Sequence, residues 1–438
     1  MATGIIAEYN PFHNGHKYML KQIREQFPQE PIVICLSGSI TQRGEMALLD
    51  KWTRAKLAVL GGANLVIELP AVFACRSAEA FGQGGTKLLT ATGLVDRLAF
   101  GTEYPDLVQL EKAASFEPDI YSGELQQLLQ QGLSYGAAIT KLMSKKLHLP
   151  EAMLYEPNTI LALEYLRSLG KLQKQGQPVP KPWAVRRQGA GHGDTLPNGK
   201  FASGTTLRQM TANSPDKNSL EKDLEPLVPP AVCQAIVSCT SYPDKEKIYQ
   251  LLRYKLLSTA PHELRQILGI SEGLEQAILQ AINSPSYEEF VRHLTSRRYP
   301  STRIQRLISH LLLSMNKELV EKMDNAGPLY LRVLAMDSTG RQLLRQIKNR
   351  GKLPLLNKAA SLVNRRDLLH PEAMNLAQQM LAMDIAATNL RSLALGETAS
   401  LYEDYLHSPC YIENLTFPYL IGDSNFNPPV LIQHRNSR

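Results

Sequence analysis

The hydrophobic positions in the first half of the chain alternate between two patterns. Short continuous apolar runs, typical of strands buried on both faces of a parallel sheet, are separated by stretches with helical periodicity. The sequence predicts strands at Gly4–Ala7, Pro31–Leu36, Leu65–Leu69, Arg97–Phe100 and Trp183–Arg187. It predicts helices at Lys17–Phe27, Lys51–Leu60, Ala78–Thr92 and Thr159–Leu169. This alternation predicts a doubly wound α/β fold with a parallel sheet, whose ligands bind at the carboxyl ends of the strands.

The second half of the chain has a different character. The segment Asn213–Pro230 is polar and charged and ends in a Pro-Pro pair, which predicts a linker. Beyond it, helical periodicity predominates and β-rich runs are few. The predicted helices are Lys245–Leu257, Pro285–Leu294, Thr302–Met315, Arg341–Lys348 and Pro371–Met383. We therefore expect an α/β domain over residues 1–215 and a mainly α-helical domain over residues 216–438, with no structural prediction for the irregular stretch after residue 410.

The composition narrows the class of protein. A chain of 438 residues exceeds the size of one simple core, so two or more domains are expected. No uncharged apolar run approaches the roughly 20 residues of a membrane span, and no signal peptide is predicted. The five cysteines form no CxxC pair, which disfavours a zinc site or a disulfide framework and favours a reducing, cytoplasmic setting. The net charge of +7 is a weak indication of a polyanionic partner.

The string EYNPFHNGH directly follows the first predicted strand. Pro11 restricts the backbone, and the pair Asn14-Gly15 permits a tight turn into a helix whose unpaired N–H groups favour an anion. His13 and His16 would both donate hydrogen bonds to one phosphate, where charge stabilisation is needed and a base is not. A metal pair is disfavoured because no third ligand lies at a supporting spacing. Ordinary loop histidines are the remaining alternative.

A second candidate phosphate anchor is ASGTTLR, residues 202–208, which follows the last predicted strand. The hydroxyls of Ser203 and Thr205 can cap a helix and bind phosphate oxygens, and Arg208 can fork onto a terminal phosphate. The alternative is a plain N-cap followed by an exposed arginine. The string KLMSKK, residues 141–146, is interpreted as the solvated face of a helix.

These strings carry a family resemblance. PFHNGH resembles the HxGH signature of nucleotidyltransferases and class I synthetases, whose members attack the α-phosphate of ATP. The longer string EYNPFHNGH, together with SGSITQRGE, DKWTRA, LVIELP and RRYPSTRIQRLISHLLL, resembles the bacterial tRNA(Met) cytidine acetate ligases over most of the chain. ASGTTLR resembles the ISSTxxR signature of the superfamily, with Gly204 where that pattern often has serine.

The resemblance implies a parallel-sheet, Rossmann-like nucleotidyltransferase domain that binds ATP, accompanied by Mg²⁺, with His13 and His16 as the catalytic residues and no dedicated metal site. Gly101 would let a nucleobase or ribose approach the backbone, and Asn158 would offer an amide unless it is only an N-cap. The ATP-binding residues implied by the resemblance and the motifs are Ile6, Ala7, Glu8, Tyr9, Asn10, Pro11, Phe12, His13, Asn14, Gly15, His16, Gly101, Asn158, Arg187, Ser203, Thr205 and Arg208.

The acetate site is left unassigned. Gln42, Arg43 and Lys51 could hold a small carboxylate, and a structured loop with Asp50 capping the next helix explains them equally well.

Basic residues gather in two stretches that contain no acidic residue, Val291–Ser314 and Arg341–Arg366. Such stretches are usually solvated faces, but two of them in one domain favour a groove for a polyanion. Tyr299 among the arginines is compatible with base stacking. The residues expected to bind tRNA are Arg297, Arg298, Arg303 and Arg306.

The resemblance implies an activity in two steps. Acetate would attack the α-phosphate of ATP to form acetyl-adenylate, and the amine of the wobble cytidine of elongator tRNA(Met) would then take the acetyl group, giving N4-acetylcytidine. Two alternatives stay open: a small-molecule nucleotidyltransferase, which needs no basic helical domain, and an RNA-binding protein with a vestigial nucleotide site. The sequence does not predict the oligomeric state.

Overall fold

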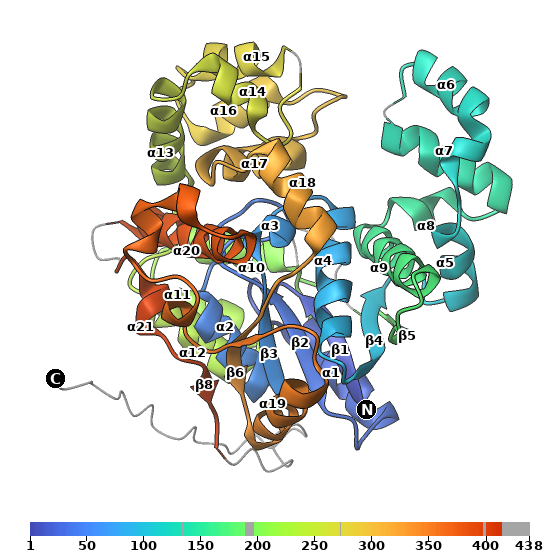
Figure 1. Ribbon diagram of the computed structural model, residues 1–438, viewed down its shortest axis with the longest axis vertical. Coiled ribbons are helices and arrows are strands. Elements are labelled where there is room, and N and C mark those ends of the chain that lie inside the picture. Colours follow the sequence, from blue (N-terminus) through green and yellow to red (C-terminus); the bar gives the residue numbers. More distant parts are fainter. Residues whose placement is uncertain (134, 189–196, 272, 397–399, 414–438) are drawn as a thin grey trace.

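A computed structural model describes residues 1–133, 135–188, 197–271, 273–396 and 400–413 (Figure 1). Parallel strands run through its centre in the order β5–β4–β1–β2–β3. Their bounds are Ala2–Ala7 for β1, Ile32–Ser37 for β2, Leu65–Leu69 for β3, Val95–Thr102 for β4 and Lys181–Arg186 for β5. Every strand predicted from the apolar runs is confirmed, with ends that shift by a residue or two.

The helices predicted between these strands are also present. They are α1 (Asn14–Gln26), α2 (Lys51–Leu60), α4 (Ala78–Ala91), which the short α3 (Ala71–Ala74) precedes, and α9 (Pro157–Lys174). Polar caps begin two of them, because the side chain of Asp50 accepts a hydrogen bond from the N–H of Thr53, and that of Ser77 from Ala80. Over the described residues, no helix combines the length and the apolar character needed to cross a membrane.

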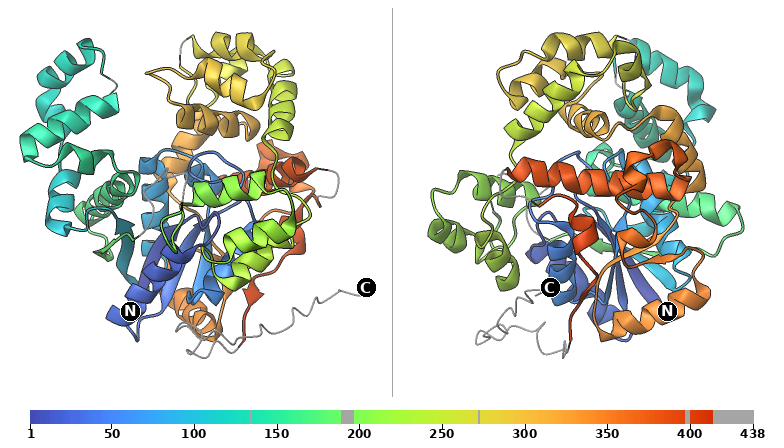
Figure 2. Two further views of the ribbon diagram at one scale, coloured as in Figure 1. Left: turned by 180° about the vertical axis from the view of Figure 1, so that it is seen from behind. Right: turned by 60° about the vertical axis from the view of Figure 1, so that its left-hand side comes forward.

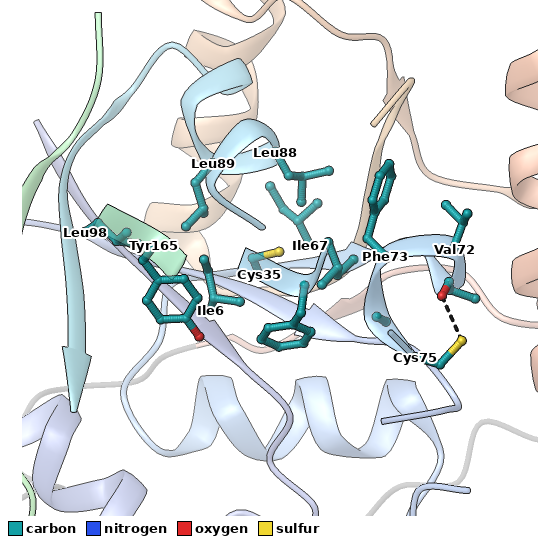
Figure 3. Close-up of a cluster of buried hydrophobic side chains, with 14 of the residues drawn as sticks. Ile6, Cys35, Ile67, Val72, Phe73, Cys75, Leu88, Leu89, Leu98 and Tyr165 are labelled. Atoms are coloured by element: carbon teal, nitrogen blue, oxygen red, sulfur yellow. Dashed lines mark hydrogen bonds between the residues drawn. The ribbon is translucent and has the colours of Figure 1, made fainter. Parts of the chain in front are cut away.

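Figure 3 shows one buried face of the sheet, where Ile6, Cys35 and Ile67 from three neighbouring strands pack with Leu88 of α4 and Tyr165 of α9. Successive residues of a strand point to opposite faces, so the residues beside these three face the other way.

The other face of the sheet is covered as well. Ile5, Ile34 and Val66 belong to a second cluster with Leu20 of α1 and Leu57 of α2. Burial on both faces explains why the strands read as continuous apolar runs. The predicted doubly wound α/β architecture is confirmed.

The chain between β4 and α9 forms an arm of helices that projects from the β5 side of the sheet (Figure 1). It consists of α5 (Leu107–Ala114), α6 (Ser122–Gln130), α7 (Tyr135–Leu147) and α8 (Glu151–Tyr155). The KLMSKK string lies on α7, where Lys146 pairs with Glu124 and the side chain of Lys145 is 74% exposed. The predicted solvated helix face is therefore confirmed.

The predicted linker over Asn213–Pro230 is wrong. After α10 (Gly204–Asn213), the chain forms α11 (Lys217–Leu224), capped by Asp216, and α12 (Pro230–Val237). Four apolar residues hidden among the charges are buried against α1 and α2: Leu220, Leu224, Leu227 and Val228. Their spacing is helical, and burial of this single stripe outweighs the polar average of the segment.

The second half of the chain contributes both helices and strands. The predicted helices overlap α13 (Lys245–Leu257), α16 (Tyr287–Leu294), α17 (Ser301–Leu312), α19 (Ser338–Arg350) and α20 (Leu376–Leu395), although α20 begins five residues later and ends twelve residues later than predicted. The other helices are α14 (Pro261–Gln266), α15 (Leu274–Ala281), α18 (Lys317–Ala326) and α21 (Glu403–Leu406). Helices α13 to α17 form a separate layer above the carboxyl ends of the strands (Figure 2).

An unpredicted strand, β6 (Leu331–Met336), extends the sheet antiparallel to β3. Two short strands, β7 (Leu355–Leu356) and β8 (Cys410–Tyr411), pair with it. The charged Arg332 interrupts the apolar run of β6, and its charge is neutralised only in the folded chain by Glu68 and Asp404. The strands β6, β7 and β8 come after residue 215 in the sequence but belong to the same sheet as β1 to β5. The domain boundary near residue 215 therefore stays a prediction.

Candidate functional site

A cavity of about 480 Å³ opens at the carboxyl ends of the parallel strands. It lies beside β1, where the order of the strands reverses, which is the usual position of a ligand in such a sheet. Its volume is typical of a small-molecule site. Most of the residues expected at an ATP site line it: Ile6, Ala7, Glu8, Tyr9, Asn10, Pro11, His13, Gly15, His16, Gly101, Asn158, Arg187, Ser203, Thr205 and Arg208.

The two histidines meet at the start of α1. His13 is the N-cap, and its Nδ1 accepts a hydrogen bond from the N–H of Gly15 at 3.1 Å. His16 Nδ1 accepts from the N–H of His13 at 3.2 Å, and the two rings stack with centroids 3.7 Å apart. Because each Nδ1 is an acceptor, each neutral ring carries its proton on Nε2. Both rings therefore have an N–H left to donate to a ligand.

Burial keeps both imidazoles neutral. It lowers the pKa of His13 to about 3, and the charge of Arg187 acts in the same direction. Burial also lowers the pKa of His16 well below its usual value, with further contributions from His13 and Arg187. The pair is thus suited to hydrogen-bond donation to a phosphate and not to ionic pairing.

Two residues of the motif do not line the cavity. Phe12 is buried on the opposite side, where a Cβ added to Gly61 would lie 2.7 Å from its ring. Asn14 donates from Nδ2 to the carbonyl oxygens of Lys200 and Pro226, both at 2.9 Å. Both side chains hold the motif in place from behind, which does not fit the expectation that they contact ATP.

The wall formed by β4, β5 and α9 presents Gly101, Asn158 and Arg187. A Cβ at Gly101 would lie 3.2 Å from Cγ of Arg187, so this glycine leaves room for the arginine. Arg187 donates to Asn158 Oδ1 at 3.4 Å, and Asn158 donates to Glu103 Oε1 at 2.5 Å. The N-cap alternative for Asn158 is wrong, because Glu156 holds that position. Glu103 orients the other two side chains.

The opposite wall is the start of α10. Ser203 caps this helix by accepting a hydrogen bond from the N–H of Thr206 at 3.0 Å. Arg208 donates to the carbonyl oxygen of Asn10 and to the Glu45 carboxylate, both at 2.8 Å. The N-cap part of the alternative is therefore present, but its exposed arginine is wrong, because the Arg208 side chain is only 21% exposed.

The glycine in ASGTTLR has a steric cause. A Cβ at Gly204 would lie 2.9 Å from the carbonyl oxygen of Asn10, in the first motif. A serine at this position would push α10 away from the HxGH turn. The close contact places Arg208 beside that turn, so the departure from the ISSTxxR pattern preserves the arrangement.

The loop after β2 forms the third side of the cavity. The backbone N–H of Gln42 donates to the Glu8 carboxylate, whose pKa is raised by burial. Arg43 and Glu45 also line the cavity. The pairing of Glu45 with Arg208 was not predicted, although Glu45 ends the string SGSITQRGE that carries part of the resemblance.

Lys51 does not reach the cavity. Its side chain is fully buried and pairs with Glu68 at 2.8 Å and Asp404 at 2.7 Å. Arg332 pairs with the same two carboxylates, so the cluster ties α2 and α21 to the β3–β6 edge. Lys51 is excluded as an acetate ligand, while the alternative, in which Asp50 caps α2, is confirmed.

The basic residues of the second half separate into two places. Arg306 of α17 lines the cavity, and Arg303, Arg298 and Arg297 continue outward from it. The stretch Arg341–Arg366 begins on α19, at the opposite edge of the sheet, because β6 runs antiparallel to β3 (Figure 1). The α19 part of this stretch therefore lies away from Arg306, which does not fit one groove formed by both stretches.

Comparisons with known proteins agree with this geometry. The family described as HIGH Nucleotidyl Transferase matches residues 1–404. The tRNA(Met) cytidine acetate ligase of Clostridium perfringens (strain ATCC 13124) is 34% identical over 421 residues, which cover 93% of this chain and 98% of the relative. That of Syntrophomonas wolfei is 34% identical over 406 residues, covering 91% and 95%.

Two solved structures are also similar. Thermotoga maritima TmcAL bound with alpha-thio ATP has a TM-score of 0.81 and 28% identity, over 94% of this chain and 100% of that one. The apo form has a TM-score of 0.83 and 29% identity over the same shares of the two chains.

Proposed function

The chain belongs to the tRNA(Met) cytidine acetate ligase family of HIGH nucleotidyl transferases, and from this premise we propose that it acetylates the wobble cytidine of elongator tRNA(Met) using acetate and ATP. The observation that carries the proposal is that one cavity is lined by the neutral histidine pair, by Arg208 and by Arg306 of α17. Acting on tRNA would place the protein in the cytoplasm.

The first step is the activation of acetate. A carboxylate oxygen attacks the α-phosphorus of ATP, the bond to the β-phosphate oxygen breaks, and pyrophosphate leaves. The Nε2–H groups of His13 and His16 donate to the α-phosphate as its charge grows. Arg208, Ser203 and Thr205 hold the departing pyrophosphate.

The nucleoside would lie on the β4–β5 side. Gly101, Asn158 and Arg187 line this wall, and the absence of a Cβ at Gly101 leaves room for Arg187 beside the nucleoside. In the free protein Arg208 is paired with Glu45, so the triphosphate would take the place of this carboxylate.

Mg²⁺ would accompany the nucleotide. Among the described residues, no group of three or more His, Cys, Asp or Glu side chains could hold a metal ion. The carboxylates of the described lining are those of Glu8 and Glu45. This donor set fits Mg²⁺ bound mainly by phosphates and water, in the usual manner of nucleotide sites. The ion would neutralise phosphate charge.

The second step transfers the acetyl group. The exocyclic amine of cytidine is a weak nucleophile, so an activated acyl group is required. The amine attacks the acetyl carbon, the bond from that carbon to the phosphate oxygen breaks, and AMP leaves. The target base must leave its stack to enter the cavity. Arg297, Arg298, Arg303 and Arg306 would bind the RNA leading to it.

Labelled acetate, ATP and total tRNA test the proposal together. The label should appear in N4-acetylcytidine and should be absent when ATP is omitted. Pyrophosphate should be released only when acetate is present. Release that requires a phosphorylated metabolite instead would indicate a small-molecule nucleotidyltransferase and refute the proposal.

A further inference from the structure

The cavity has a second end that the residues expected to bind ATP do not occupy. Its lining comes from the segments that follow β2 and β3 and from α17. The residues are Thr41, Gln42, Arg43, Ser77, Ala78, Phe81, Thr302 and Arg306. The HxGH turn, Arg187 and Arg208 line the remainder of the same cavity, where the proposed function places ATP.

We propose that Arg43 and Arg306 form an oxyanion site at this end, which binds a backbone phosphate of the acceptor RNA next to the reacting cytidine. The inference rests on the proposed function and adds to it the place where the RNA chain enters the cavity.

Backbone contact brings the two arginines together. Gly44 has φ +79°, and a Cβ there would lie 2.6 Å from the carbonyl oxygen of Gln305 and 2.7 Å from Cα of Arg306. The Ser309 hydroxyl donates to the carbonyl oxygen of Gly44 at 2.8 Å. The loop that carries Arg43 is therefore held directly against α17, and the two side chains enter the cavity from adjoining segments.

The charge around Arg306 is not balanced. Its guanidinium is half-buried, and the described residues offer it no carboxylate within ion-pair distance. Burial lowers its pKa, and the charges of Arg303 and Arg43 add to that effect. Of the carboxylates that line the cavity, Glu45 pairs with Arg208, and Glu8 accepts a backbone N–H and also interacts with the charge of Arg43. An external anion would relieve the repulsion of Arg306 by Arg303 and Arg43.

The arrangement favours a polynucleotide over acetate as the source of this anion. A lone carboxylate such as acetate needs only one arginine, which can donate two hydrogen bonds to it. This site offers more than one, because Arg303 lies one turn before Arg306 on α17 and Arg298 precedes both in the sequence. Tyr299 lies between them, 4.6 Å from the Arg303 guanidinium and 5.6 Å from that of Arg298. A row of arginines around an aromatic ring matches successive phosphates and a stacked base.

Two assays on Arg306→Ala and Arg43→Ala test the site. The first is acetate-dependent exchange of pyrophosphate into ATP, which needs no RNA, and the second is the affinity for tRNA(Met) measured over a range of salt. We expect each variant to weaken tRNA binding about 10-fold and to lower the salt slope by roughly 0.7, the value for one contact with a single strand. Arg306→Lys should recover most of the salt slope because it keeps the charge.

A matched control is Arg345→Ala, which removes an exposed arginine of α19 at the opposite edge of the sheet and should bind tRNA like the wild type. An exchange rate that falls as far as tRNA binding, with a raised KM for acetate, would assign the pair to acetate and overturn the inference. An unchanged salt slope would also overturn it. If the wild type fails to acetylate tRNA, the proposed function is wrong. If the wild type acetylates tRNA but both variants bind tRNA as the wild type does, only this inference is wrong.

Discussion

The proposed chemistry depends on histidines that stay neutral, and this can be tested through protein stability. The folded pKa of His13 is about 3, far below the value of about 6.5 in an unfolded chain. At pH values between these two, the unfolded chain therefore binds a proton that the folded chain excludes. Stability is fully present above about pH 6.5 and falls as the pH is lowered from there.

The size of the effect follows from the slope of about 1.36 kcal/mol per pH unit for one proton. Between pH 8 and pH 5, this slope acts over the roughly 1.5 pH units that lie below the unfolded pKa of about 6.5. The proton bound by His13 in the unfolded chain should therefore lower the free energy of unfolding of the wild type by about 2 kcal/mol. The variant His13→Asn removes the titrating group but keeps a side-chain oxygen that can accept from the N–H of Gly15.

Urea denaturation of both proteins at pH 8 and pH 5 measures this difference. Titrating groups away from His13, such as Asp384, whose pKa is raised to about 7, are present in both and cancel in the comparison. We expect the wild type to lose about 2 kcal/mol more than His13→Asn. Equal losses would show that the folded protein tolerates a charged His13, and the neutral-donor mechanism would then be wrong.

Three further substitutions test other contacts. Glu45→Gln should tighten ATP binding roughly 2- to 5-fold, because a partly exposed pair with Arg208 worth up to about 1 kcal/mol no longer competes with the phosphates; calorimetry measures this. Gly204→Ala should slow acetyl-adenylate formation roughly 10- to 100-fold in the exchange assay, because its Cβ would lie 2.9 Å from the Asn10 carbonyl oxygen. Lys51→Met should lower the free energy of unfolding by roughly 3–5 kcal/mol, since it leaves two buried carboxylates with the single charge of Arg332 between them.

Each of these has a matched control elsewhere in the chain. Glu289→Gln breaks a surface pair outside the cavity, Gly123→Ala adds a Cβ with no atom within 4 Å, and Lys322→Met breaks a pair on the surface of α18. All three should behave as wild type. Weaker ATP binding by Glu45→Gln would mean that Glu45 holds the nucleotide, and full exchange activity of Gly204→Ala would refute the steric account. A stable Lys51→Met would contradict the role of the buried cluster.

The sequence by itself determined the features that depend on short spacing. Apolar runs located the parallel strands β1 to β5, because strands buried on both faces consist mostly of apolar residues. The HxGH turn was also readable, because the proline, the Asn-Gly pair and the histidines that build it lie within a few residues.

Segments whose character depends on distant partners were misread. Segment 213–230 reads as a polar linker until its apolar stripe meets α1 and α2. β6 carries a charge that reads as a break until Glu68 and Asp404 neutralise it. Burial and neutralisation are properties of pairs of segments, so neither is visible in one segment alone.

Only the tertiary structure decided which residues share the cavity. It turned Phe12 and Asn14 away from the cavity, although they belong to the motif, and enclosed Lys51 in a buried ion cluster. It also brought Arg306 beside Arg43 from far along the chain, while the arginines of α19 went to the opposite edge of the sheet. The direction of β6 decided that separation, because an antiparallel strand delivers the helix after it to the edge away from the cavity.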